Sequence, residues 1–164
     1  MTNQSHIITA LVHNNSGVLT RISGLFARRC YNIDSLSVCT TEDPRFSRMT
    51  ICASGDDCTI TQIIKQLEKL TDTVNVSRLN RLDDITRELL LIKIRLSPKQ
   101  RPELESTANF YKAKIVDLAP KSAVIELTGD HDKIDAFVEL MRPYGIIEIV
   151  RTGLTAIERG EMHT

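Results

Sequence analysis

Apolar residues in the first half of the chain follow two spacings in turn, and these predict strands and helices. Apolar runs of strand length predict strands over residues 6–12, 33–41, 46–53 and 74–79. Apolar positions three and four residues apart predict amphipathic helices over residues 18–26 and 60–70. The resulting order, β-α-β-β-α-β, is that of the ferredoxin-like fold, in which right-handed crossovers place both helices on one face of an antiparallel sheet.

Local signals refine the two predicted helices. The apolar stripe of the first helix is expected to face the core and consists of Val18, Leu19, Ile22, Leu25 and Phe26. Ser16 is expected to cap the start of this helix, and the stretch Gly55-Asp56-Asp57 offers a cap for the second. Arg21 is expected on the exposed face of the first helix.

The second half of the chain repeats the pattern less regularly. Strands are predicted over residues 88–96, 115–118, 123–127 and 146–150, with helices after Ser97-Pro98 and after Gly129-Asp130. The sequence therefore predicts an α+β protein of two tandem ferredoxin-like domains, residues 1–80 and 87–164, joined by a linker at 81–86. The second half lacks the Asn-rich glycine turn that follows the first strand, so a binding role is expected in the first half only.

Composition and charge exclude several classes of function. Lys plus Arg and Asp plus Glu both number 21, so the formal net charge is zero and nothing favours nucleic acid or an anionic membrane. No apolar run reaches the roughly 18 residues of a membrane span, and the start of the chain lacks the features of a signal peptide. We therefore expect a cytoplasmic protein.

The sequence offers no catalytic or metal-binding motif. The cysteines form no C-x-x-C pair and have no histidines at metal-ligand spacing, so Cys39 and Cys52 are expected to be small buried side chains. No acid–base pair, nucleophile triad, P-loop or dinucleotide fingerprint is present. The chain alone is expected to be non-catalytic, with no metal site.

Long segments of the chain resemble a known family. Residues 14–26, 31–38 and 41–51, and more weakly 151–160, resemble in order and spacing the small regulatory subunits of acetohydroxyacid synthase, whose first half is an ACT domain. The resemblance implies a homodimer formed through ACT domains that binds valine or another branched-chain amino acid at the interface. It also implies a catalytic partner subunit, which carries thiamine diphosphate, Mg²⁺ and FAD. This chain is then expected to activate the catalytic subunit and to make it subject to feedback inhibition.

The resemblance also implies which residues bind the effector: Asn14, Gly17, Val18, Asn32 and Ile33. Their chemistry suits an amino acid, because backbone N–H groups at a helix start attract a carboxylate and asparagine amides can both donate and accept. Taken alone, Asn and Gly after a strand are more often ordinary turn formers than ligand-binding residues, and only the matching segments favour a binding role. Two positions depart from the family pattern. Cys30 replaces a usual glycine before Tyr31, and His13 replaces a common acidic residue.

Other functions of this fold stay open on sequence alone. A stand-alone amino-acid-sensing ACT protein would share the same site, and as a transcription factor it would need a helix-turn-helix and a basic surface. An acylphosphatase would need an arginine within the loop after the first strand, where the first arginine here is Arg21, a full turn into the helix.

Overall fold

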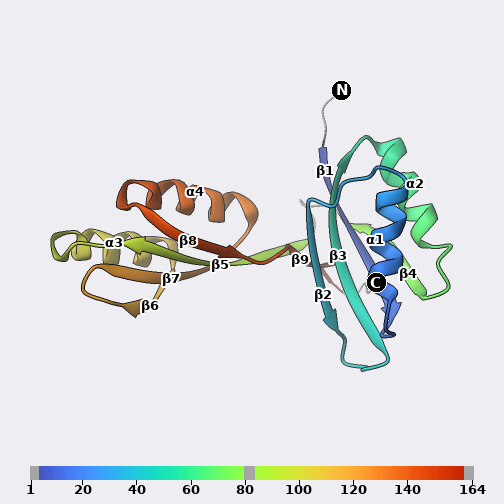
Figure 1. Cartoon of the computed structure of the whole chain (residues 1–164), viewed down its shortest axis with the longest axis horizontal. Coiled ribbons are helices and arrows are strands. Elements are labelled where there is room, and N and C mark those ends of the chain that lie inside the picture. Colours follow the sequence, from blue (N-terminus) through green and yellow to red (C-terminus); the bar gives the residue numbers. More distant parts are fainter. Residues whose placement is uncertain (1–3, 80–83, 161–164) are drawn as a thin grey trace. The chain divides into compact units, whose positions relative to one another are not determined.

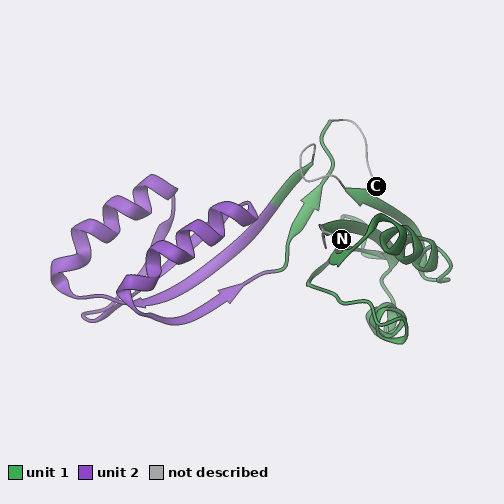
Figure 2. Ribbon diagram, turned by 90° about the horizontal axis from the view of Figure 1, so that it is seen from above, with its two compact units in different colours: residues 1–86, 153–164 green, residues 87–152 purple. Residues whose placement is uncertain are grey.

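The computed structural model describes residues 4–79 and 84–160 and divides the chain into two compact units. Unit 1 comprises residues 1–86 and 153–164, and unit 2 comprises residues 87–152 (Figure 2). These bounds differ from the sequence-based domains, because the segment from Gly153 belongs with the first unit. Part of the predicted linker, residues 81–83, lies outside the described residues, and Ile85 and Thr86 already form the start of a strand.

Unit 1 is a four-stranded antiparallel sheet, as the sequence predicts, and its strands have the spatial order β2-β3-β1-β4. Its elements are β1 (Gln4–His13), α1 (Val18–Arg28), β2 (Ser35–Thr40), β3 (Phe46–Gly55), α2 (Asp57–Leu67) and β4 (Thr73–Leu79). Both helices cover the same face of the sheet (Figure 1). The core between them contains Ile8, Ile51, Ile22 and Ile60, each at most 1% exposed.

The start of α1 differs from the prediction. The N-cap is Gly17, in the left-handed conformation with φ of 83°, so the expected Ser16 cap is wrong. Of the predicted apolar stripe, Leu19 is wrong too, because its side chain is 47% exposed while the other four residues are buried. The cap of α2 is confirmed, since the Asp56 carboxylate accepts a hydrogen bond from the Thr59 N–H at 2.7 Å.

The end of α1 contains an unfavourable backbone conformation. Cys30 has a φ of 56°, in the left-handed region that normally favours glycine, and its N–H donates to the carbonyl of Ala27 at 3.1 Å. The position where the family pattern has glycine is thus one whose geometry suits glycine.

The face of the unit 1 sheet opposite the helices is partly covered by the C-terminal segment. Its residues Leu154 and Ala156 form a small buried cluster with Ile7, Cys52 and Leu79. Cys52 is therefore buried as expected. The expectation for Cys39 is wrong, because it lies exposed near the end of the edge strand β2.

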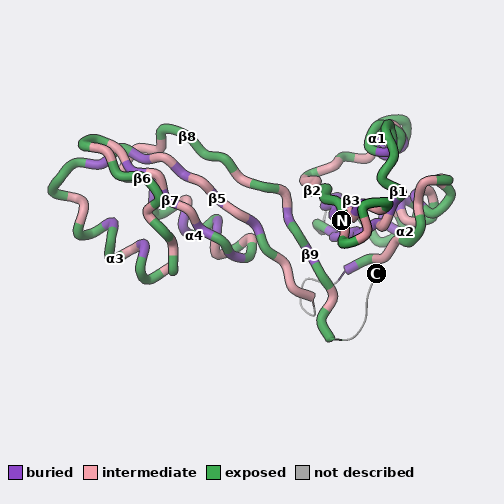
Figure 3. The backbone as a smooth tube through the Cα atoms, turned by 90° about the horizontal axis from the view of Figure 1, so that it is seen from below, coloured by how far each residue is buried: buried purple, intermediate pink, exposed green. Residues whose placement is uncertain are grey.

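Unit 2 has the same topology, with the spatial order β6-β7-β5-β8; the short strand β9, which belongs to unit 1, pairs with β5, whose first residues also belong to unit 1. Its elements are β5 (Ile85–Arg95), α3 (Arg101–Tyr111), β6 (Lys114–Leu118), β7 (Ser122–Gly129), α4 (His131–Met141) and β8 (Ile146–Arg151), with 3₁₀ turns at Pro98–Gln100 and Arg142–Tyr144; β9 is Thr155–Ile157. Buried positions alternate along β5 (Figure 3), as a sheet with helices on one face requires.

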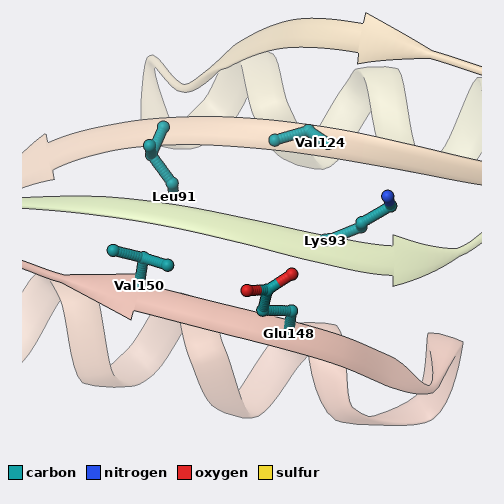
Figure 4. A pocket seen from close by; sticks show the side chains of 5 residues that line it. All are labelled: Leu91, Lys93, Val124, Glu148 and Val150. Carbon is teal, nitrogen blue, oxygen red and sulfur yellow. The ribbon is translucent and has the colours of Figure 1, made fainter.

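The other face of the unit 2 sheet carries a shallow depression of about 240 Å³. Leu91, Lys93, Val124, Glu148 and Val150 from three neighbouring strands line it (Figure 4). Its lining mixes aliphatic groups with one charge of each sign.

A cluster of charged side chains lies at one end of the unit 2 sheet. Glu88 is buried, and its carboxylate accepts hydrogen bonds from Arg151 and from His131, the latter at 3.0 Å. Arg151 also donates to Asp135 at 2.5 Å. These contacts join β5, β8 and α4, so they fix the helix against the sheet.

Candidate functional site

Asn14 follows β1 and is held by the turn between β2 and β3. Its backbone N–H donates to the carbonyl of Arg45 at 2.7 Å, and its side-chain Nδ2 donates to the carbonyl of Pro44 at 2.9 Å. A carbonyl oxygen can only accept a hydrogen bond, so this contact fixes which way the amide faces. The Oδ1 of Asn14 is turned away from this carbonyl and can accept a hydrogen bond from a ligand.

The turn that holds Asn14 is itself rigid. Arg45 donates from its backbone and its Nε to Asp43 Oδ1, both at 3.0 Å. These hydrogen bonds lower the pKa of the Asp43 carboxyl below its usual value. His13, just before Asn14, lies against Phe46 with 5.2 Å between the ring centroids, so the residue that departs from the family pattern borders this site.

Gly17 leaves the start of α1 without a side-chain cap, whereas Asp56 and Asp130 cap α2 and α4. The first backbone N–H groups of a helix have no partner within the helix, so those of α1 are suited to an external anion. Val18 points into the core and is only 5% exposed, and its backbone N–H donates to the carbonyl of Asn15 at 3.4 Å, so its side chain does not face a ligand.

Arg21 adds positive charge beside Gly17. A Cβ built on Gly17 would lie 3.4 Å from Arg21 Nη1, and Arg21 Nε donates to Asp72 at 2.7 Å. The sequence assigned Arg21 to a solvated helix face. Its return toward the helix start is set by Asp72, which lies 51 residues away along the chain.

Asn32 and Ile33 precede β2 at the opposite end of the sheet. Asn32 Nδ2 donates to Asp34 Oδ1 at 2.6 Å, and the hydroxyl of Ser54 donates to Asp34 Oδ2 at 2.6 Å. Ile33 is half-buried against the core between sheet and helices. Asp34 was not among the residues singled out from the sequence, since neither of its partnerships has a sequence signature.

A single chain does not bring the two asparagines together. The backbone of Asn14 bonds to Arg45, and that of Asp34, two residues after Asn32, bonds to Cys52. Arg45 and Cys52 are seven residues apart in the sequence. At about 3.3 Å per strand residue, Asn14 and Asp34 therefore lie roughly 23 Å apart. Unit 1 therefore carries two separate patches, one with Asn14 and Gly17 and the other with Asn32 and Ile33.

Within the described parts of the chain, no three or more His, Cys, Asp or Glu side chains are grouped so as to hold a metal ion. No helix among residues 4–79 and 84–160 is long and apolar enough to cross a membrane.

Comparison with known proteins decides the family. Residues 8–75 match the ACT domain of the type found in AHAS small subunits, and residues 87–160 match the small subunit of acetolactate synthase. The chain belongs to the acetolactate synthase small subunit family. The probable acetolactate synthase small subunit of Archaeoglobus fulgidus is 49% identical over 94% of this chain and 97% of its own length. The acetolactate synthase small subunit of Haemophilus influenzae is 44% identical over 94% and 96%.

A solved structure supports the same conclusion. The acetolactate synthase small subunit from Thermotoga maritima has a TM-score of 0.89 and 38% identity, covering 97% of this chain and 99% of that one. The family resemblance drawn from the sequence is thereby confirmed, and so are the two ferredoxin-like folds. The five candidate effector residues remain predictions.

Proposed function

We propose that this small subunit activates a catalytic acetolactate synthase subunit and makes it subject to feedback inhibition by a branched-chain amino acid, most simply valine. The observation that carries the proposal is the separation of the two polar patches on unit 1. Each patch offers part of an amino-acid site, and a second copy of the chain is needed to complete it.

The edge strand β2 suits such pairing. Among the described residues, β2 pairs with no strand other than β3, so its other edge can receive a second strand along the part that the C-terminal segment does not contact. If two copies of β2 pair antiparallel, the start of one lies beside the end of the other. Asn32 and Ile33 of one copy then come near Asn14 and Gly17 of its partner, which gives two equivalent sites related by a two-fold axis.

The ligand chemistry follows from the groups present. The carboxylate binds at the uncapped start of α1, near the backbone of Gly17 and Val18 and the guanidinium of Arg21. The ammonium binds the amide oxygens of Asn14 and Asn32. An aliphatic side chain packs against Ile33, and burial of about three methyl or methylene groups there adds affinity at ~0.8 kcal/mol for each.

Regulation follows from the position of the site between two chains. A ligand that contacts both copies stabilises the paired state, and that state then differs in its affinity for the partner enzyme. In this proposal thiamine diphosphate, Mg²⁺ and FAD belong to the catalytic subunit, the complex is cytoplasmic, and this chain supplies no catalytic group.

Calorimetric titration of the purified chain with valine, leucine and isoleucine tests the proposal. We expect saturable heat with at least one of them, lost in Asn32→Ala and in Asn14→Ala. Asn109→Ala is the matched control, because Asn109 is an exposed asparagine on α3 of unit 2. Sedimentation velocity reports whether the ligand strengthens a dimer. The assay of the catalytic subunit with and without this chain reports activation and inhibition. Absence of heat together with absence of any effect on the catalytic subunit would refute the proposal.

A further inference from the structure

Asp34 is held in place from three directions. Its carboxylate accepts hydrogen bonds from Asn32 Nδ2 and from the Ser54 hydroxyl, each at 2.6 Å, and its backbone N–H donates to the carbonyl of Cys52 at 2.9 Å. Ser54 and Cys52 belong to β3, so the central part of the sheet fixes the carboxylate.

The contact with Asp34 settles how Asn32 presents its amide. A carboxylate accepts hydrogen bonds and cannot donate one, so the nitrogen of Asn32 must face it. The Oδ1 of Asn32 is therefore turned away from the Asp34 carboxylate and can accept a hydrogen bond from a ligand, close to a negatively charged residue. A ligand ammonium is attracted by the amide oxygen and the nearby negative charge. A ligand carboxylate is repelled by that charge, and a neutral hydroxyl gains little from it.

We infer that Asp34 is the positioning residue that makes the site select the α-ammonium group of its ligand. It does so by holding the Nδ2 of Asn32, so that the Oδ1 of Asn32 is turned away from Asp34 and can accept from that ammonium. The inference rests on the proposed effector site and extends it to specificity. Asp34 discriminates an amino acid from 2-hydroxy and 2-oxo acids with the same side chain, which share the carboxylate and the aliphatic group. The start of α1, more than 20 Å away in the same chain by the ~3.3 Å rise of each strand residue, reads the carboxylate these compounds share.

The test compares valine with 2-hydroxy-3-methylbutanoate in calorimetric titrations of the full chain. Asp34→Ala should weaken the charge-assisted contact with the ammonium of valine. We therefore expect the affinity for valine to fall about tenfold to a hundredfold. Affinity for the hydroxy acid should change by less than about threefold, because that ligand has no ammonium. The ratio of the two affinities is the decisive quantity, since general damage to the site would weaken both ligands alike.

Two further variants separate position from charge. Asp34→Asn keeps an oxygen that accepts from Asn32 Nδ2 and should recover part of the valine affinity. Ser54→Ala removes only the hydroxyl hydrogen bond to Asp34 Oδ2, while the backbone contact with Cys52 remains, and should have a smaller effect than Asp34→Ala. Equal losses for both ligands in Asp34→Ala, or no rescue by Asp34→Asn, would overturn the role of Asp34.

A measurement without ligand checks the contact itself. In nitrogen-15 NMR spectra, the side-chain amide protons of Asn32 should exchange with solvent more slowly in the wild type than in Asp34→Ala. Unchanged exchange overturns the positioning role even if valine binds the wild type, which leaves the proposed function standing. Slow exchange in the wild type with no binding of any branched-chain amino acid would refute the proposed function and, with it, the selectivity.

Discussion

Leu154 donates its backbone N–H to the hydroxyl oxygen of Ser35 at 3.1 Å, although 119 residues separate them in the sequence. Ser35 is the first residue of β2 and directly follows Asp34. The C-terminal segment is therefore anchored on the strand that begins at the Asn32 patch. Gly153 makes this approach possible, because a Cβ at that position would lie 2.6 Å from the carbonyl oxygen of Leu36.

Gly153→Ala should release the C-terminal segment from unit 1. The added methyl group meets backbone that cannot move aside, so we expect a loss of about 1–3 kcal/mol in the free energy of unfolding of unit 1. Ser35→Ala removes only the hydrogen-bond acceptor and should cost less, about 0.5–1.5 kcal/mol. Urea unfolding gives the energies, and hydrogen exchange of the Leu154 amide reports the docking. Unchanged protection of that amide in Gly153→Ala would show that the segment does not depend on this contact.

Gly17→Ala should weaken both the fold and the proposed effector site. An alanine at φ of 83° costs roughly 1–2 kcal/mol, because a Cβ clashes with the following backbone in the left-handed region. Gly24→Ala is the matched control within the same helix. There the backbone is helical and only the flexible end of Arg28 is near, so alanine should stabilise by about 0.5–1 kcal/mol. In thermal unfolding, the melting temperature of Gly17→Ala should therefore fall and that of Gly24→Ala should rise. Valine titration of both variants then tests the effector site. Equal melting temperatures would contradict this account.

Cys30→Gly should stabilise unit 1. The side chain of Cys30 is exposed and its φ is 56°, so replacement by glycine removes backbone strain without creating a cavity. We expect a gain of about 0.5–1 kcal/mol, reduced from the full cost of the strain by the greater freedom of glycine in the unfolded chain. Lys112, at the end of α3 in unit 2, also has a φ of 56° and gives a parallel test. Cys30→Val should destabilise, and a stabilising effect of valine would refute the interpretation.

The fold could be predicted because its periodicities are local. Strand-length apolar runs and helical spacing predict the four α-helices and every strand except β9, and the residues Gly55-Asp56-Asp57 indicate the cap of α2. The errors have local causes as well. Leu19 lies next to core positions but on the wrong side of the helix, and Ser16 loses the cap position to Gly17 because only glycine adopts φ of 83° readily.

The site was only partly predictable, for a different reason. Asn14 and Gly17 stand out in a turn, and Asn32 lies in a segment that resembles the family. Asp34 and Arg21 are defined by partners distant in sequence, Ser54 and Asp72. The docking of the C-terminal segment on β2 likewise has no signature in the pattern of polar and apolar residues.

Stability at acid pH should depend on the Asp56 cap. Hydrogen bonds from Thr59 lower the pKa of Asp56 below its usual 3.8 in the folded state. Protonation is therefore less favourable in the folded than in the unfolded chain. The resulting stabilisation is present above pH 3.8, and it is lost as the pH falls below 3.8 and through the lower pKa that Asp56 has in the folded state. Asp56→Ser keeps a capping oxygen but does not titrate, so its stability should fall less steeply in this range. Urea unfolding of both proteins at pH 3 to 7 tests this, and parallel curves would count against it.

Loss of Arg151 should strongly destabilise unit 2. Burial works against its charge, but hydrogen bonds to Asp135 and Glu88 raise the pKa of the guanidinium above its usual value. The Glu88 side chain is only 5% exposed, so Arg151→Met leaves a buried carboxylate whose remaining partner, within the described part of the chain, is His131 at 3.0 Å. Breaking a buried ion pair in this way costs about 3–5 kcal/mol. The double variant Glu88→Leu with Arg151→Met removes both charges and should recover most of that loss, because apolar pairs of similar size often replace buried ion pairs without cost. Urea unfolding of wild type, both single variants and the double variant gives the coupling energy. A cost below about 1 kcal/mol for Arg151→Met would place this pair with ordinary surface ion pairs.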